Sequence, residues 1–280
     1  FFSFAFASAF ACTLVRWVLA PNFPKGTNWS YCNTGYLLAG MIIKSVTGSE
    51  KVAPVLRQRI LDPLNLNSTF LDIEENLIGE LAHGWIHNSE TGEWLDVSGL
   101  PRTALYSCMY TAGAMLSTTE NMVRWVRSLY RGEVFSQESL NEMFSIVEFS
   151  NPTILGYGLG TMKRVWLGEQ AWSHGGDTFS FGSQAAYFPG RDVSIIVLVN
   201  QRNYPYQDFY NMITEQLFKQ VANYYLYPHD ITHLYNLKVT STFIRPLADT
   251  LKITAMLNNP DNPSALKCRR RLRQRRRKKS

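Results

Sequence analysis

The sequence predicts an α+β fold: an antiparallel β-sheet flanked by helices, with a helical subdomain ahead of the sheet. Two observations carry this prediction. Apolar residues recur at helical spacing in several stretches before residue 150, whereas after residue 157 short apolar runs are separated by Gly, Pro and Asp turns. Hydrophobic residues make up 45% of the 280 residues, which permits a sizeable core and excludes general disorder.

The helical part follows a loop at residues 21–26 that contains two Pro and one Gly. Apolar residues at helical spacing predict a helix over residues 34–46, and Gly48 stands where this helix would end. A second helix is expected over residues 51–60. Residues 70–110 contain many turn formers and show no strong period, so loops and short strands are expected there.

Two further helices are predicted before the sheet. Residues 117–120, Ser-Thr-Thr-Glu, match a capping box, which predicts a helix through Leu129 that ends at Gly132. Residues 136–146 are expected to form the next helix.

The sheet is predicted from four short apolar runs. Residues 189–192, Pro-Gly-Arg-Asp, are typical of a hairpin turn between two of them, and residues 208–221 fit a closing helix on one face of the sheet. The predicted strands are residues 157–160, 165–167, 185–188 and 193–199.

The net charge of +6 is unevenly placed. Ten of the 28 Lys and Arg residues lie between Lys267 and Lys279, where there is no Asp or Glu, so residues 1–266 carry a net charge of −4. We therefore predict three parts along the chain. They are an apolar N-terminal segment of unclear role at residues 1–20, a main domain at residues 21–225, and an extension with a basic tail at residues 226–280.

Both ends leave alternatives open. The uncharged start is shorter than the ~20 apolar residues of a membrane span, so a truncated targeting segment, a membrane-skimming helix and a non-native terminus all fit it. The basic tail fits a solvated disordered segment, a nucleic-acid patch or a weak contact with an anionic membrane. It holds no aromatic residue for base stacking, which disfavours specific nucleic-acid reading.

The four Cys residues form no Cys-x-x-Cys pair, and the five His residues form no persuasive ligand set. We therefore expect buried free thiols, no metal site and no cofactor.

Tyr31-Cys32-Asn33, at a junction between a loop and a helix, is the first candidate site. Two side chains separated by one residue just before a helix can project into the same cleft. A nearby cation or strong hydrogen bonds would favour the ionised Tyr31, which could then exchange a proton with a serine. The Asn33 amide both donates and accepts hydrogen bonds, which suits holding a substrate amide or carbonyl. An aromatic anchor beside a helix cap is the structural alternative.

His174-Gly175-Gly176-Asp177 is the second candidate site. An imidazole near a strand end could act as a cationic or hydrogen-bonding partner of Tyr31. Gly175 and Gly176 expose backbone to a substrate lying along the strand, and the Asp177 N–H could be one donor of an oxyanion hole. A Gly-rich turn with a surface His is the structural alternative.

Seven segments taken in order form a combination that is more specific than any one of them. They are residues 28–40, 46–48, 60–64, 111–118, 157–160, 174–178 and 196–200. Together they resemble the penicillin-recognising serine hydrolases, which include class C β-lactamases, D-alanyl-D-alanine carboxypeptidases and related esterases. The resemblance covers roughly residues 20–222.

The resemblance implies hydrolysis of an amide or ester through an acyl-enzyme. In that family a Ser-x-x-Lys motif supplies the nucleophilic serine and an activating lysine. Carried over by position, Tyr31 is the acid/base, Asn33 orients the substrate and His174 takes the role of the cation on the strand. The implied partner is a small-molecule or peptide acyl substrate. Many relatives work in extracytoplasmic or organellar settings, although this sequence carries no clear address.

The sequence departs from the family most seriously at the nucleophile. Its only Ser-x-x-Lys, residues 264–267, follows all the other motifs and adjoins the basic run, so we do not expect it to be catalytic. No Gly-x-Ser-x-Gly elbow is present either. Smaller departures are Cys32 in place of the usual Ser, and Ser180 where a Gly is common. The predicted domain is therefore incomplete.

Three functions remain open from the sequence. The first is a serine hydrolase whose nucleophile lies upstream of Phe1, so that this polypeptide alone is nearly inactive, because loss of such a serine costs on the order of 10⁶ in turnover. The second is a catalytically dead relative that serves as a binding or scaffold domain. The third is a nucleic-acid or membrane-surface protein that acts through its basic tail.

Overall fold

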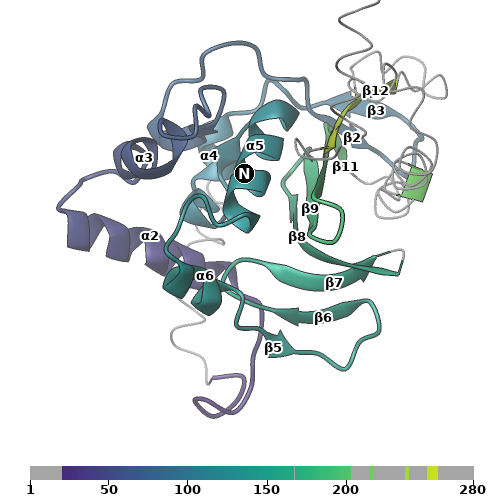
Figure 1. The fold of residues 1–280 in the computed structure, drawn as a ribbon. Coiled ribbons are helices and arrows are strands. Elements are labelled where there is room, and N and C mark those ends of the chain that lie inside the picture. The colour runs from purple at the N-terminus through teal and green to yellow at the C-terminus, as the bar shows by residue number, and fades with distance from the viewer. Residues whose placement is uncertain (1–20, 167, 203–214, 217–236, 240–250, 258–280) are drawn as a thin grey trace, which may run out of the picture.

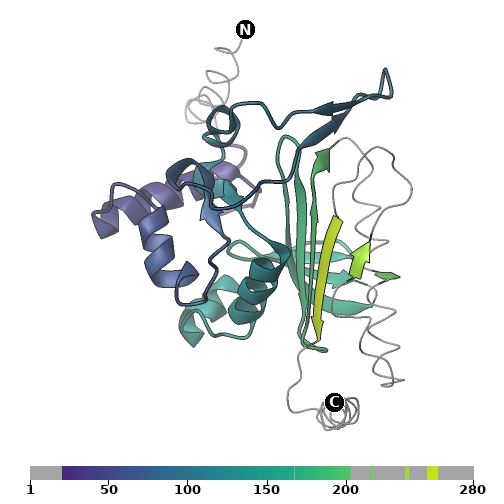
Figure 2. The same ribbon diagram turned by 90° about the horizontal axis from the view of Figure 1, so that it is seen from above.

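The structure, a computed structural model, describes residues 21–166, 168–202, 215–216, 237–239 and 251–257. In this part of the chain, helices gather on one side of a large antiparallel sheet (Figures 1 and 2). The expected α+β fold is confirmed, and most of the helical part precedes the sheet in the chain, as predicted. The described helices are α2 (Asn33–Thr47), α3 (Ala53–Leu56), α4 (Arg102–Tyr106), α5 (Thr119–Tyr130) and α6 (Gln137–Met143), with short turns η1 (Arg57–Leu61), η2 (Asp72–Glu74) and η3 (Tyr110–Ala112).

Helix α2 confirms the prediction over residues 34–46 and its end at Gly48. This glycine adopts φ 66° and ψ 9°, a left-handed conformation that residues with a Cβ rarely accept, and it therefore stops the helix. The second predicted helix, at residues 51–60, is present as α3 followed by one π-helical turn, η1.

Helix α5 begins one residue later than the predicted capping box. Thr118, rather than Ser117, is the N-cap, and its side-chain oxygen accepts a hydrogen bond from the Asn121 N–H at 3.3 Å. Ser117 instead bonds the hydroxyl of Thr69 at 2.8 Å, which takes it out of the cap. The helix ends before Gly132, as expected. The helix predicted at residues 136–146 is shorter, because α6 ends at Met143.

The large sheet has the order β12-β13-β10-β9-β8-β7-β6-β5 among the described residues, and neighbouring strands are antiparallel. A separate hairpin, β2–β3, pairs with β11, and β1 pairs with β4. The bounds are β1 Phe70–Leu71, β2 Trp85–His87, β3 Trp94–Asp96, β4 Met115–Leu116, β5 Val147–Glu148, β6 Ile154–Tyr157, β7 Met162–Trp166, β8 Glu169–Asp177, β9 Gly182–Phe188, β10 Val193–Val199, β11 Gln201–Arg202, β12 Leu237–Val239 and β13 Leu251–Leu257.

Three of the four predicted strands coincide with β7, β9 and β10, and the hairpin turn at residues 189–192 is confirmed by the hydrogen bond from the Arg191 N–H to the Phe188 carbonyl. The strand predicted at residues 157–160 is wrong. Strand β6 ends at Tyr157, and the next residues form a turn, closed by the Gly158 N–H bonding the Thr161 carbonyl at 2.8 Å. The two glycines of this segment therefore mark a turn rather than a strand.

Several predictions fall mainly outside the described residues. These are the apolar segment at residues 1–20, the basic tail at residues 267–279, and most of the closing helix at residues 208–221, of which residues 215 and 216 are described and helical. Strands β12 and β13 lie within the predicted extension, and β13 pairs with β10 of the main sheet. The boundaries of the three predicted parts remain a prediction.

Helix α5 joins the helical part to the sheet. Its buried Val123 and Val126 pack with Tyr187 of β9 and Ile196 of β10, all between 0% and 6% exposed. Full burial of such side chains contributes roughly 1.5–3 kcal/mol each. This layer fixes one face of the sheet against α5, and the candidate site lies at its edge.

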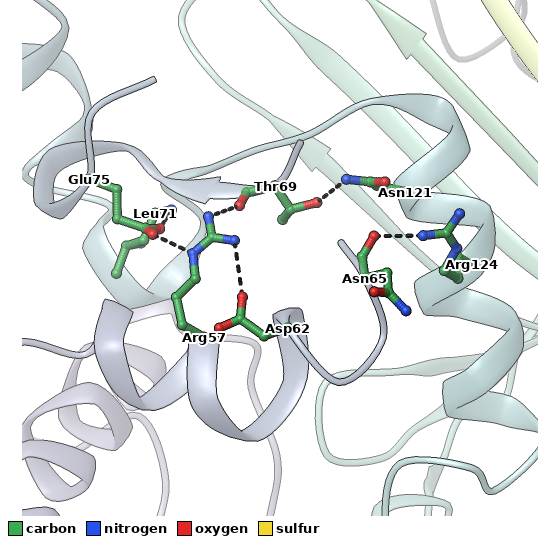
Figure 3. A network of polar contacts seen from close by, with 8 residues as sticks. All are labelled: Arg57, Asp62, Asn65, Thr69, Leu71, Glu75, Asn121 and Arg124. Atoms are coloured by element: carbon green, nitrogen blue, oxygen red, sulfur yellow. Dashed lines mark hydrogen bonds and ion pairs between the residues drawn. The ribbon is translucent and has the colours of Figure 1, made fainter. Parts of the chain in front are cut away.

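A polar network ties η1 to the chain that leads to η2 (Figure 3). The Arg57 guanidinium donates to the Glu75 carboxylate at 2.6 Å and to the Thr69 carbonyl at 2.5 Å. Thr69 in turn accepts a bond from the Asn121 amide of α5 at 3.2 Å. The Arg57 side chain is 22% exposed and that of Glu75 17%, so the pair is partly shielded from water.

We expect Arg57→Met to lower the free energy of unfolding by about 1–2 kcal/mol, because it removes the guanidinium that donates to one oxygen of the Glu75 carboxylate and to the Thr69 carbonyl. Urea denaturation measures this change. Arg59→Met, on the exposed side of the same turn, is the matched control and should change stability by less than about 0.5 kcal/mol. Equal effects of the two substitutions would contradict the role of the network.

Candidate active site

Tyr31 and Asn33 stand at the start of helix α2. Cys32 is the N-cap in an extended conformation, and Asn33 is the first helical residue. Tyr31 is 45% exposed and Asn33 is also exposed, so both side chains are accessible to a substrate. The helix start thus presents a phenol and an amide to solvent.

His174 lies in strand β8 and points toward the helical side of the sheet. Its cross-strand partner is Ala185 of β9, and directly opposed residues of an antiparallel pair share a face. Ala185 packs against the cluster that α5 forms with the sheet. The register therefore directs the imidazole to the side on which α2 and α5 lie.

The structure brings Tyr31 and His174 together. Their ring centroids are 6.3 Å apart with an interplanar angle of 41°. A third ring, Tyr157 at the end of β6, lies 5.8 Å from each of them, and its hydroxyl oxygen is 2.9 Å from His174 Nε2. The described contacts include none between Asn33 and these rings. A helix start and two strands thus form one aromatic site.

Burial lowers the pKa of His174 below its ordinary value, and the hydrogen bond from Nδ1 to the Gly175 carbonyl, at 2.6 Å, offsets this only in part. The imidazole is therefore neutral at pH 7. It serves as a hydrogen-bonding group in the described chain, whereas the resemblance had implied a cation.

His174 therefore makes stability depend on pH. Because its folded pKa lies below that of the unfolded chain, the unfolded state binds the proton more readily, and stability falls as pH drops from about 7.5 through 6.5 toward the folded pKa. His174→Gln should flatten this part of the profile, measured as urea midpoints between pH 7.5 and 5. His87→Gln, on the β2–β3 hairpin, is the control. An unchanged profile in His174→Gln would contradict the assignment.

Burial also raises the pKa of Tyr31, and the neighbouring Tyr36 raises it further. The side chain is therefore a protonated phenol at neutral pH. It can donate a proton, but the described surroundings do not favour the phenolate that would accept one.

The end of strand β8 carries the predicted substrate-binding backbone. Gly175 and Gly176 face β9 closely: a Cβ at Gly176 would lie 2.9 Å from the Ser183 hydroxyl oxygen. Asp177 ends the strand and is exposed. The following loop is closed by the Thr178 N–H, which bonds the Phe181 carbonyl at 2.8 Å. The roles of Gly175, Gly176 and Asp177 stay predictions.

Ser180 occupies the loop position where the family often has a glycine. It is 4% exposed and packs against Gly84, where an added Cβ would overlap the Ser180 side chain. The departure is therefore accommodated by a small residue opposite.

A cavity of about 400 Å³ borders this site, between α5 and the sheet. One end is polar and includes His174, Gly175, Ser183 and Gln184. The rest is apolar, so the cavity suits an apolar group that ends in a polar one. The main apolar lining residues are Met122, Trp125, Leu129, Phe135, Met143 and Leu159.

Tyr157 is the site residue that the sequence analysis missed. The sequence predicts only a strand at this position, although the segment around Tyr157 belongs to the family resemblance. The sequence signal for Tyr157 is a tyrosine that directly precedes a glycine-containing segment at the end of a strand. In the sheet, only β7 separates this strand from β8, which carries His174.

Other functional features are absent from the described ranges. No cluster of three or more His, Cys, Asp or Glu side chains there has the arrangement of a metal site. Cys32 is half-buried and Cys108 is exposed, so the expectation of buried thiols is wrong for these two cysteines, which form no disulfide among the described residues. No helix in this part of the chain has both the length and the hydropathy needed to cross a membrane.

Comparison with known proteins gives one family match. The sequence model described as Beta-lactamase matches residues 18–214. Unguisins hydrolase ungD' of Aspergillus campestris is 26% identical over 188 residues, which are 63% of this chain and 34% of the relative. Penicillin-binding protein 4* of Bacillus subtilis is 25% identical over 148 residues, 51% of this chain and 33% of the relative. The chain thus spans about a third of the length of these curated relatives.

Solved structures agree. A D-stereospecific amidohydrolase from Streptomyces sp. superposes with a TM-score of 0.57 and 31% identity, over 65% of this chain and 53% of the other. A D-amino acid amidase from Ochrobactrum anthropi, complexed with L-phenylalanine amide, has a TM-score of 0.55 and 26% identity over 62% of this chain and 50% of the other. With the sheet, the helix-start tyrosine and the strand histidine in place, the family match over residues 18–214 leads to one conclusion: this chain belongs to the Beta-lactamase family of serine hydrolases.

Proposed function

We propose that this domain provides the acid/base and substrate-binding side of a serine hydrolase that cleaves amides or esters through an acyl-enzyme. The observation that carries the proposal is the approach of the Tyr31 and His174 rings to 6.3 Å, at the mouth of a site that is open to solvent. In this proposal the nucleophilic serine and its lysine belong to a Ser-x-x-Lys segment outside the present sequence.

Each step of the reaction needs a group at this site. A serine oxygen attacks the substrate carbonyl carbon, and its proton passes to the phenolate form of Tyr31. Tyr31 then gives a proton to the departing nitrogen or oxygen, which leaves an ester between the acyl group and the serine. Water attacks that ester, and the reverse proton movements release the acid and the free serine. Asn33 holds the substrate amide, and the Asp177 N–H faces the carbonyl oxygen.

No Lys or Arg is among the described groups that shift the pKa of Tyr31. Burial keeps Tyr31 protonated, so a nearby lysine is needed to make its phenolate accessible near neutral pH. A Ser-x-x-Lys segment supplies the nucleophile and that lysine together. The need for a lysine beside Tyr31 therefore supports a single segment, outside the present sequence, that carries both the serine and the lysine.

The apolar cavity beside His174 is the place where we expect that segment to pack. A nucleophile must come within about 2.6–3.2 Å of its base, which requires a segment next to Tyr31. Leu159, which lines the cavity, is 65% exposed, so an incoming apolar segment would find an uncovered apolar side chain there.

The relatives support an amide of an amino acid or a short peptide as substrate. They include proteins named D-amino acid amidase and D-aminopeptidase. The apolar lining of the cavity also suits a substrate with an apolar side chain, if the incoming segment leaves part of the cavity open.

A covalent labelling experiment tests the proposal. A fluorophosphonate probe and a fluorescent penicillin are added to the purified chain and to the longer polypeptide read from the gene ahead of Phe1. We expect no label on the chain alone, an in-frame Ser-x-x-Lys in the longer product, and a label on that serine. Labelling of the present chain would overturn the proposal that the nucleophile lies outside it. Absence of an in-frame Ser-x-x-Lys motif would favour a catalytically dead binding domain instead.

The basic tail stands as a separate candidate for nucleic-acid or membrane contact, because ten basic residues lie between Lys267 and Lys279. Deleting residues 267–280 tests it directly. Binding to RNA or to anionic vesicles that persists after the deletion would exclude the tail as the cause.

A further inference from the structure

The hydrogen bonds of His174 define which of its nitrogen atoms carries the proton. Nδ1 lies 2.6 Å from the Gly175 carbonyl oxygen, which can only accept, so Nδ1 must be the donor. A neutral imidazole then has a lone pair on Nε2. The Tyr157 hydroxyl, 2.9 Å from Nε2, must therefore donate to it.

Tyr157 is itself held firmly. Its side chain is 4% exposed, and the Trp29 ring packs against it with centroids 5.2 Å apart. The two residues around it add to the restraint, because a Cβ at either Gly156 or Gly158 would overlap a backbone carbonyl oxygen. The hydroxyl therefore stays within reach of Nε2, and the Tyr36 side chain is its second hydrogen-bonding partner.

The side chains that face His174 from other elements are mostly phenols. None of the described effects on its protonation comes from a carboxylate or a cation: burial is the main one and the Gly175 bond the other. The facing titratable groups are Tyr157 of β6, Tyr31 and Tyr36 at α2 and Tyr130 of α5, and on β7 Lys163, whose ammonium lies over the Trp172 ring.

We propose that Tyr157 is a positioning residue of this site: its hydroxyl donates to His174 Nε2, holds the imidazole as the neutral Nδ1–H tautomer, and sets the face that the ring presents to Tyr31. This deepens the proposed function and rests on it only for the catalytic meaning of Tyr31. The His174 imidazole thus reaches Tyr31 with its Nε2 already occupied. It orders the site and does not exchange the proton with the substrate.

Nitrogen-15 NMR of the present chain tests this proposal without any catalytic activity. Of the five histidine signals, the one that disappears in His174→Gln is assigned to His174. We expect its spectrum at pH 8 to show the proton on Nδ1 and a hydrogen-bonded, unprotonated Nε2. A proton on Nε2 would overturn the proposal, whatever the outcome of the labelling experiment.

Tyr157→Phe removes only the hydroxyl. Because the lost bond stabilises the neutral imidazole, the substitution should raise the pKa of His174 and increase its proton affinity about three- to tenfold. Tyr187→Phe is the matched control: it also removes the hydroxyl of a buried tyrosine, but that hydroxyl bonds Asp192 at 3.0 Å. It should leave the His174 titration unchanged.

The comparison separates positioning from general stability. Equal titrations in Tyr157→Phe, Tyr187→Phe and the unaltered chain would contradict the proposal. If Tyr157→Phe does not fold, the His174 tautomer observed in the unaltered chain still supports or overturns the proposal. In the longer polypeptide, Tyr157→Phe should change the pH dependence of kcat and leave KM nearly unchanged. A purely structural defect would not produce this pattern.

Discussion

Tyr31→Phe should lower kcat/KM for an amide substrate by about 10²–10⁴-fold in a polypeptide that carries the Ser-x-x-Lys segment. The substitution removes the only group that the proposed mechanism uses to protonate the departing nitrogen. It leaves the ring in place, with its edge contact to Tyr157 and its tilted contact with His174. The loss should therefore appear in kcat, because the phenol acts in the transition state rather than in substrate binding.

Steady-state kinetics with the longer polypeptide measure this effect. Tyr187→Phe is the control, since its hydroxyl bonds Asp192 at the far end of β9. We expect its kcat to stay within about threefold of the unaltered protein. The assignment of Tyr31 fails if Tyr31→Phe raises only KM or costs no more than the control. An ester with a good leaving group should suffer less from Tyr31→Phe than an amide, because it needs less protonation.

Local sequence signals predicted those elements whose ends are set by backbone chemistry. Helix α2 follows from its apolar spacing and its left-handed Gly48, and strand β10 follows from an apolar run after a Pro-Gly-Arg-Asp turn. The error at residues 157–160 has the same origin. Short apolar runs interrupted by glycine fit a strand or a turn equally well, and only the hydrogen bond between Gly158 and Thr161 decides between them.

The candidate site was predictable in part for a related reason. Tyr31 and His174 were found because each lies in a motif that the family resemblance aligns. Tyr157 could not be placed, since its contact with His174 depends on strand register across β7 and on a register shift between Ile154 and Gly156. Register is a tertiary property that turn geometry and the buried face decide together. The protonation of His174 likewise depends on burial, which one sequence does not display.

The position of Tyr31 also depends on how closely helix α2 packs, and two glycines of that helix make this testable. At Gly40, which is buried, a Cβ would lie 2.8 Å from Thr111 Cβ and closer still to its hydroxyl oxygen. Thr111 donates a hydrogen bond to the Tyr36 carbonyl at 2.8 Å, so the same contact holds the helix near its start. At Gly35 an added Cβ would meet nothing within 4 Å.

Gly40→Ala and Gly35→Ala should therefore change stability in opposite directions. The overpacked Gly40→Ala should cost about 1–3 kcal/mol, whereas Gly35→Ala should gain up to about 1 kcal/mol from the lower flexibility of the unfolded chain. Because Gly40→Ala must push α2 away from η3, it should also displace Tyr31 and reduce kcat in the longer polypeptide. Urea denaturation and steady-state kinetics measure the two effects.

A second substitution distinguishes this contact from a general loss of helix stability. Thr111→Ala removes the two side-chain atoms nearest to the new methyl group, so Gly40→Ala combined with Thr111→Ala should be more stable than the sum of the single changes predicts, by about 0.5–3 kcal/mol. Additive effects would mean that Gly40 does not set the distance between α2 and η3. In that case the distance between Tyr31 and His174 would have to be set by the ring contacts themselves, which join Trp29 to Tyr157 and both Tyr157 and Tyr31 to His174.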